Sequence, residues 1–134
     1  MRAIKKVVLV ADENFLSSYL ISKYICKADH SVIWTQNGLE AVKMCEINPE
    51  IDLVIMNVSL SELSGVEAAH RIKELRCGLP VVLHSASNRI CDFAANIDCD
   101  DFINKQVDKE IIIGIINKYL NTNGDIKKIL RVLS

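Results

Sequence analysis

Short continuous apolar runs recur along the chain and are separated by segments with helical periodicity. The runs lack the polar alternation of a half-exposed strand, so they indicate strands that are buried on both faces. They are bounded by polar residues and by glycine or proline, as strands usually are. The predicted strands cover residues 7–11, 31–34, 53–56, 81–84 and 101–103.

Apolar residues spaced three or four apart predict helices between these strands. The first helix is expected to begin at Asp12-Glu13-Asn14, which are favourable helix-start residues, and to run to about Lys27. Within it, apolar side chains recur at Leu16, Tyr19, Leu20, Tyr24 and Ile25. Further helices are predicted over about 39–47, 66–75, 89–96 and 111–119. The inner side of the second is expected to carry Leu39, Val42 and Met44 or Cys45.

Strands that alternate with helices at these spacings predict an α/β fold. The expected architecture is a doubly wound, five-stranded parallel sheet with helices on both faces. This domain is expected to occupy residues 1–120. A break at Asn121-Thr122-Asn123-Gly124 separates it from a C-terminal tail, 121–134, which is expected to be a linker or a short extra helix over about 125–133.

Composition places the chain among ordinary globular domains. It has 134 residues, 50% of them hydrophobic, and a net charge of −1. The near-neutral balance gives no electrostatic case for binding nucleic acid or membrane surfaces. No apolar run reaches the roughly 18 residues that span a bilayer, and the start lacks a secretory cleavage pattern. A cytoplasmic location is therefore expected.

The five cysteines agree with a reducing compartment. Their number is odd and no pair has Cys-x-x-Cys spacing, which argues against a zinc or disulfide framework. They are interpreted as small apolar residues that are buried or half-buried. They are Cys26, Cys45, Cys77, Cys91 and Cys99.

Polar residues follow four of the predicted strands. Asp12, Asn57, Ser85 and Lys105 stand after the first, third, fourth and fifth strands. Because function in an open parallel sheet gathers at the carboxyl ends of the strands, these side chains are expected to converge on one shallow pocket. His84, inside an apolar strand, is interpreted as a core or sheet-face histidine.

Four segments carry a resemblance to the receiver domains of two-component signalling. Residues 7–14 resemble the opening of that family, 53–65 its acceptor strand and loop, 80–86 the strand with the switch hydroxyl, and 100–105 the strand with the switch aromatic and the lysine. The resemblance implies a flavodoxin-like receiver fold. It also implies that Ser85 and Phe102 match the switch pair and that Lys105 matches the family lysine.

The departures from the family pattern bear on its chemistry. In receivers an aspartate accepts a phosphoryl group from a histidine kinase, and Asn57 stands in its place. Ala11 is interpreted as the position of the first acid of a usual pair, which leaves only Asp12. Further departures are Ser61, Ser64 and Gln106. The resemblance therefore implies a receiver-like module that is not phosphorylated, is not an enzyme and acts by protein–protein contact.

The family binds Mg²⁺ through carboxylates and a backbone carbonyl, here that of Ser59. With Asp12 and Asn57 as the remaining ligands, Mg²⁺ binding is expected to be weak or absent, and no other cofactor is expected. Asn57 could accept a hydrogen bond from Lys105 and donate one to Asp12, or Lys105 could point into solvent. Glu13 could act as a ligand or simply begin the helix.

Other functions remain open at this point. The chain could be a normal receiver with an engineered Asp-to-Asn block, although the additional departures speak against a single designed change. It could also be a small flavodoxin-like ligand-binding domain, although the acidic loop after the first strand would repel phosphate. The expected partner is a histidine kinase, an output domain or another regulator. A homodimer through the fourth helix, fifth strand and fifth helix is a further possibility.

Overall fold

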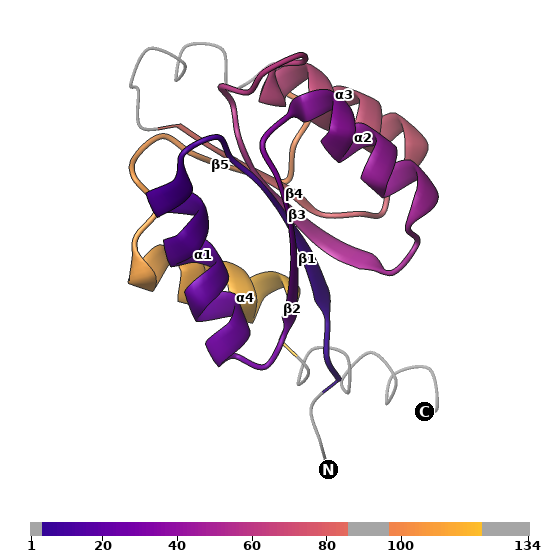
Figure 1. Ribbon diagram of the computed structural model, residues 1–134. Helices are drawn as coiled ribbons and strands as arrows, with labels where there is room; N and C mark the ends of the chain where they lie inside the picture. Colours follow the sequence, from indigo (N-terminus) through magenta and orange to yellow (C-terminus); the bar gives the residue numbers. More distant parts are fainter. Residues whose placement is uncertain (1–3, 86–96, 122–134) are drawn as a thin grey trace, which may run out of the picture.

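The sheet has the predicted class and number of strands. The computed structural model describes residues 4–85 and 97–121 (Figure 1). All five strands run parallel in the order β2-β1-β3-β4-β5, which confirms the doubly wound architecture. The strands are β1 (Val7–Ala11), β2 (Ser31–Thr35), β3 (Ile51–Asn57), β4 (Val81–His84) and β5 (Asp101–Ile103).

Two pairs of helices cover the two faces of the sheet. Helices α1 and α4 lie together on one face, and α2 and α3 lie together on the other (Figure 1). Each helix begins where a side-chain oxygen accepts a hydrogen bond from a backbone N–H of the first turn. The helices are α1 (Phe15–Lys27), α2 (Gly38–Ile47), α3 (Gly65–Leu75) and α4 (Lys109–Tyr119), capped by Asn14, Asn37, Ser64 and Asp108.

Successive residues of the central strands feed two separate cores. Leu9 and Val54 pack beneath α2 and α3, whereas Val8, Leu53 and Ile55 pack beneath α1 and α4. Both faces of these central strands are therefore buried, which explains why the sequence shows continuous apolar runs there instead of alternation. The bounds of β1, β4 and β5 agree with the predicted strands.

The apolar pattern of α1 matches its buried face only in part, because Ile25 is buried and Leu20 and Tyr24 pack against the core, but other positions differ. Ser18, Ile21 and Ile25 are buried, whereas Leu16 is 75% exposed and Tyr19 is 57% exposed. The first turn of α1 lies at the carboxyl edge of the sheet, where less core is available to cover it. Apolar side chains on this turn therefore remain at the surface.

The inner side of α2 also differs at one position from the prediction. Val42 and Cys45 are buried as expected, but Leu39 is 36% exposed and Ala41 is buried in its place. The predicted helix over 89–96 and the tail over 121–134, beyond residue 121, lie outside the described residues. The expected dimer face includes the predicted helix over 89–96. Along 4–85 and 97–121, no helix has the length and apolarity needed to cross a bilayer.

Candidate functional site

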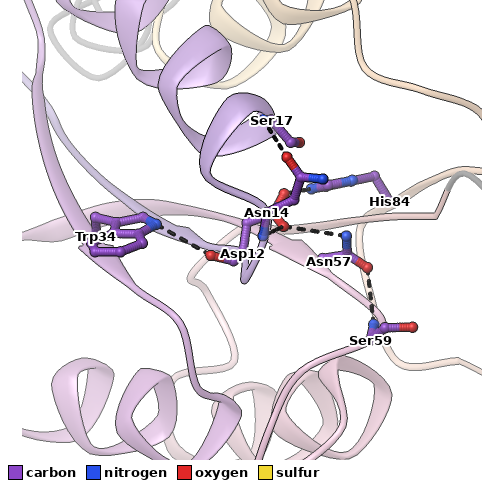
Figure 2. A network of polar contacts seen from close by, with 7 residues as sticks. All are labelled: Asp12, Asn14, Ser17, Trp34, Asn57, Ser59 and His84. Carbon is purple, nitrogen blue, oxygen red and sulfur yellow. Dashed lines mark hydrogen bonds and ion pairs between the residues drawn. The ribbon is translucent and has the colours of Figure 1, made fainter.

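Asp12 is a buried carboxylate directly after β1. Its side chain is only 1% exposed. Its backbone is fixed from β2, because Asp12 N donates to the Thr35 carbonyl at 3.0 Å and Trp34 Nε1 donates to the Asp12 carbonyl at 3.2 Å. Asp12 Oδ1 accepts from the backbone N–H of Asn14 at 2.9 Å (Figure 2). These contacts hold one carboxylate at the carboxyl edge of the sheet.

Asn57 ends β3 and lies beside this carboxylate. Its Nδ2 donates to Asp12 Oδ1 at 3.4 Å, as the sequence predicted. Its Oδ1 accepts from the backbone N–H of Ser59 at 2.9 Å (Figure 2). Both ends of the amide are therefore engaged: its NH₂ group donates to the carboxylate, and its oxygen accepts from the loop after β3.

The predicted contact of Lys105 with this pair is not made. Lys105 is exposed, and within 4–85 and 97–121 its side chain has no hydrogen bond or ion pair with Asp12 or Asn57. The N–H of Ser59 takes the place that the sequence assigned to the lysine on Asn57 Oδ1. Because β5 ends at Ile103, Lys105 lies two residues beyond the sheet, and its long side chain reaches solvent.

His84 is the site residue that sequence reasoning missed. It is buried, as predicted, but β3 and β4 pair in a register that sets it opposite Asn57. Its Nε2 lies 3.5 Å from Asp12 Oδ2 (Figure 2). Burial lowers the pKa of His84, while the nearby Asp12 carboxylate acts in the opposite direction. The signal in the sequence was a titratable residue at the last position of an otherwise apolar strand.

The structure also corrects the interpretation of the acids after β1. Ala11 is the last residue of β1, is fully buried and packs in the core beneath α2 and α3, so it does not face the site. The two residues that follow the strand are Asp12 and Glu13. Glu13 is exposed, and its Oε1 accepts from Ser61 Oγ at 2.5 Å. An acid pair is therefore present, but its second member is bound to the loop after β3.

Ser85 and Phe102 lie on neighbouring strands near this edge. Ser85 is buried, and its backbone N–H donates to the Ile103 carbonyl at 2.9 Å. Phe102 is half-buried and packs against the core beneath α2 and α3. The structure thus brings both residues to the carboxyl side of the sheet. In the described parts of the chain, no hydrogen bond links Asn57 to Phe102 or to the backbone of Ser85.

A shallow groove opens beside the polar cluster. Its volume is about 550 Å³, and it combines exposed apolar side chains of α1 with polar side chains at the strand ends. Phe15 lies next to it and stacks on Tyr19, with 6.3 Å between the ring centroids. The groove is lined by Asn14, Leu16, Ser17, Tyr19, Leu20, Asn57, His84, Gln106 and Val107.

The comparisons with known proteins identify the family. The model of the response regulator receiver domain matches residues 8–117, which is most of the chain. The chain belongs to this family. It is thus a receiver domain of the kind used in two-component signalling, and the flavodoxin-like ligand-binding alternative is displaced.

Relatives and solved structures extend this finding. The chain is 30% identical over 81 residues to the uncharacterized transcriptional regulatory protein YbdJ of Bacillus subtilis, covering 60% of this chain and 35% of that protein. It spans between 9% and 35% of the length of the first curated relatives that it matches.

Two solved receivers share the fold at low identity. One is the receiver domain of the sensor histidine kinase PA1611 from Pseudomonas aeruginosa, with magnesium in its active site cleft. It has a TM-score of 0.76 and 18% identity, covering 87% of this chain and 98% of that one. The other is the Saccharomyces cerevisiae receiver Ssk1, solved with the phosphotransfer protein Ypd1. It has a TM-score of 0.76 and 24% identity, covering 89% and 91%.

The residues at the site do not fit the family's Mg²⁺. This ion requires oxygen ligands in near-octahedral geometry and prefers carboxylates. Here Asp12 Oδ1 is already engaged, and Asp12 Oδ2 faces an imidazole nitrogen. Asn57 brings no charge. Along the described parts of the chain, no three His, Cys, Asp or Glu side chains are grouped so that they could hold a metal ion.

Proposed function

We propose that this receiver domain accepts no phosphoryl group and acts in a two-component pathway through contact with a protein partner. The observation that carries the proposal is the state of Asn57. This residue occupies the place of the family's acceptor aspartate, and both ends of its amide are bound, to Asp12 and to Ser59. It offers neither a negative charge nor an available oxygen nucleophile.

The surroundings of Asn57 support the same conclusion. Phosphoryl transfer depends on positioning and on neutralising charge at the transferring group. The Asp12 carboxylate faces His84 and Asn57, and the Glu13 carboxylate is bound by Ser61. Lys105 points away into solvent. We therefore expect Mg²⁺ to bind weakly or not at all, and we expect no enzymatic activity.

Without a phosphoryl group the switch pair has no input. Ser85 and Phe102 lie on neighbouring strands, but a shift between two conformations needs a ligand that contacts them differently. The domain is accordingly proposed to present one constant surface. This distinguishes it from a receiver whose partner choice changes on activation.

The groove beside α1 is the proposed contact surface. Leu16 and Tyr19 are exposed apolar residues that line it, and Phe15, 70% exposed, extends it. Exposed apolar residues grouped at a groove are typical of protein-binding sites. The receiver Ssk1 is solved in complex with a histidine phosphotransfer protein, which supports a partner of that kind. A histidine kinase, an output domain or another regulator would meet the same surface.

Net charge and composition bear on the kind of partner and on the cellular compartment. The net charge of −1 supports a protein partner over nucleic acid. The described cysteines are free: Cys45 is buried, whereas Cys26 and Cys77 are exposed, contrary to the expectation that all would be at least half-buried. Free cysteines support a reducing compartment, and we propose the cytoplasm.

Acetyl phosphate tests the chemical part of the proposal. Intact-mass spectrometry after incubation with Mg²⁺ and acetyl phosphate is expected to show no phosphoryl adduct on the wild-type domain. Asn57→Asp restores the acceptor carboxylate, and this variant is expected to gain the adduct. A stable adduct on the wild type would contradict the proposal.

Surface substitutions test the contact part. Leu16→Ser and Tyr19→Ser are each expected to weaken binding of a histidine phosphotransfer domain by about tenfold, because exposed anchors in a groove carry most of an interface's energy. Ile113→Ser on α4 is the matched control, since Ile113 is 41% exposed but does not line the groove. Equal binding by all three variants in a calorimetric titration would exclude this surface.

A further inference from the structure

Three lysine side chains converge on one tyrosine ring where α1 and α4 lie together (Figure 1). The Nζ atoms of Lys23, Lys27 and Lys109 lie 5.8, 5.7 and 5.9 Å from the centroid of the Tyr24 ring. An aromatic ring face attracts an ammonium group within about 6 Å. Two helices that are far apart in the sequence thus bring three positive charges to one place, and we call these four residues the lysine–tyrosine patch.

The three lysines of the patch are not paired with acids. Within 4–85 and 97–121, none of them forms an ion pair with a carboxylate. Asp108 precedes Lys109 in the sequence, but its Oδ1 accepts from the backbone N–H of Ile111 as the cap of α4. Lys118, farther along α4, differs, because its Nζ lies 2.8 Å from Asp101 Oδ2. The patch is therefore locally positive, although the net charge of the chain is −1.

The arrangement is electrostatically unfavourable by itself. Each Nζ lies within 5.9 Å of the same point, so any two are separated by less than twice that distance. This range is comparable to the Debye length of about 8–10 Å, so salt screens the mutual repulsion only in part. The Tyr24 ring offsets some of it. A negatively charged group placed among the lysines would relieve the rest.

The tyrosine ring is held by the core. Tyr24 is half-buried and packs against the core beneath α1 and α4, whereas the three lysines are exposed. A fixed ring keeps the ammonium groups near one another before any ligand binds, and their apolar stems can lie along it. Such preorganisation reduces the entropy that is lost on binding.

We propose that the lysine–tyrosine patch binds a short acidic segment of a protein partner, one that carries several glutamate or aspartate side chains close together. Charge complementarity selects this occupant. Anionic membranes are recognised by clusters of roughly four to eight basic residues, and nucleic acid by strongly basic domains. Three ammonium groups on a chain of net charge −1 fall short of both.

The patch is distinct from the groove beside α1. None of its four residues lines the groove, which is built from the first turns of α1 and from the strand ends. The inference therefore goes beyond the proposed function and does not depend on it. A partner could use either surface alone, and the two can be tested separately.

The test is a titration of the full chain with a hexaglutamate peptide at low ionic strength, followed by NMR. The amide signal of Tyr24 and the side-chain signals of the three lysines are expected to shift. The affinity is expected to fall when the salt concentration rises from about 20 to about 200 mM, because exposed charges are then screened. Lys23→Gln combined with Lys109→Gln removes one charge from each helix and is expected to lower the affinity about fivefold.

Matched variants separate the patch from other surfaces. Lys5→Gln combined with Lys43→Gln changes the net charge equally at two exposed positions outside the patch, and the affinity is expected to stay within about twofold. Leu16→Ser in the groove is expected to leave it unchanged. Tyr24→Phe keeps the ring face and the binding, whereas Tyr24→Leu is expected to weaken binding about threefold because the lysines lose their common support.

The contrary results are specific. Equal losses in the two lysine double variants overturn the proposal, as do shifts confined to the groove or the absence of saturable peptide binding. An oligonucleotide or phosphatidylglycerol vesicles of equal charge that bind the patch at least about tenfold more tightly would also contradict it. Circular dichroism confirms that each variant is folded, and the exposed lysine variants suffice if Tyr24→Leu does not fold.

Discussion

The two edges of the sheet treat buried polar groups in opposite ways. At the amino edge, the half-buried Arg76 guanidinium donates to backbone carbonyls that lie between α2 and β3. Its four acceptors are the carbonyl oxygens of Cys45, Asn48, Pro49 and Ile51, at 2.8–3.4 Å. A single cation at the end of α3 thus donates hydrogen bonds to the carbonyl groups around the turn from α2 to β3.

Carboxylates complete the amino edge. Asp52 Oδ2 accepts from the N–H of Val7 at 2.8 Å, where β1 begins. Asp100 Oδ2 accepts from the N–H of Val81 at 2.7 Å, where β4 begins, and from Lys73 Nζ at 2.9 Å. The first N–H of each of these strands is paired to a side chain.

The carboxyl edge has the contrary character. Asp12 Oδ2 and His84 Nε2 are buried without hydrogen bonds, and apolar side chains such as Leu16 stand exposed beside them. This contrast teaches that the amino edge pairs its buried polar groups, whereas the carboxyl edge keeps two of them unpaired. Sites commonly carry such a cost in stability.

Removing Arg76 is expected to give the largest loss of stability. Arg76→Ala removes one hydrogen-bond donor from each of four carbonyls, and we expect the free energy of unfolding to fall by about 3 kcal/mol. Arg71→Ala is the control, because Arg71 is exposed and pairs only with Glu67, at 3.3 Å. We expect a change of about 0.5 kcal/mol or less for it. Urea denaturation measures both, and equal losses would remove the special role of the amino edge.

A glycine next to the site gives the second largest effect. A Cβ added at Gly65 would lie 2.1 Å from the Asn57 carbonyl oxygen, so the loop after β3 approaches the strand end too closely for any side chain. Gly65→Ala is expected to destabilise the domain by about 2 kcal/mol. Gly114→Ala on α4 meets no atom within 4 Å, and it is expected to stabilise by about 0.5–1 kcal/mol. Thermal unfolding of the two variants should shift in opposite directions.

His84 provides the sharpest contrast with Arg76. Because His84 Nε2 makes no hydrogen bond, His84→Leu loses none there and adds apolar surface to the core. We expect the free energy of unfolding to change by about 1 kcal/mol or less at pH 7.5. A loss as large as that of Arg76→Ala in urea would mean that the two edges do not differ in this respect.

The pH dependence of stability is expected to carry a smaller signature of the same residue. Burial lowers the pKa of His84 below its ordinary value of about 6.5, with Asp12 opposing, so the unfolded state takes up the proton more readily. This contribution to stability is complete above about pH 6.5 and is lost as the pH falls below that value. Burial also lowers the pKa of His30.

Denaturation between pH 7.5 and 5 measures this effect. Wild type is expected to lose stability over this range, and His84→Leu is expected to lose less. His70→Ala serves as the control and should follow the wild type. A His84→Leu profile that coincides with the wild type would show that His84 is not held neutral by the fold.

The sequence predicted the scaffold more fully than the site. The strands were predictable because burial on both faces leaves continuous apolar runs, as in Val81–His84. The proximity of Asp12 and Asn57 followed from parallel topology. The contact of Asp12 with His84 did not, because it depends on the register between β3 and β4. The exposure of Leu16 was also missed, since helical periodicity does not say where a core ends.

The role of Arg76 illustrates a further limit. Nothing in the local pattern around Arg76 distinguishes it from an ordinary charged residue at the end of a helix. Its function arises from carbonyls 25 to 31 positions earlier in the chain. The assignment of Ala11 to the site failed although the end of β1 was predicted correctly, because Ala11 faces the core beneath α2 and α3 and the two acids follow the strand.

The central claim is that the site at the carboxyl edge has lost phosphoryl acceptance, and phosphotransfer from a histidine donor tests it most directly. The domain would be mixed with a radiolabelled histidine phosphotransfer protein and Mg²⁺, and the Asn57→Asp variant would be treated in the same way in parallel. The label on each chain would be followed over time. We predict that the wild type stays unlabelled while Asn57→Asp takes up label. Stable label on the wild-type chain would contradict the account.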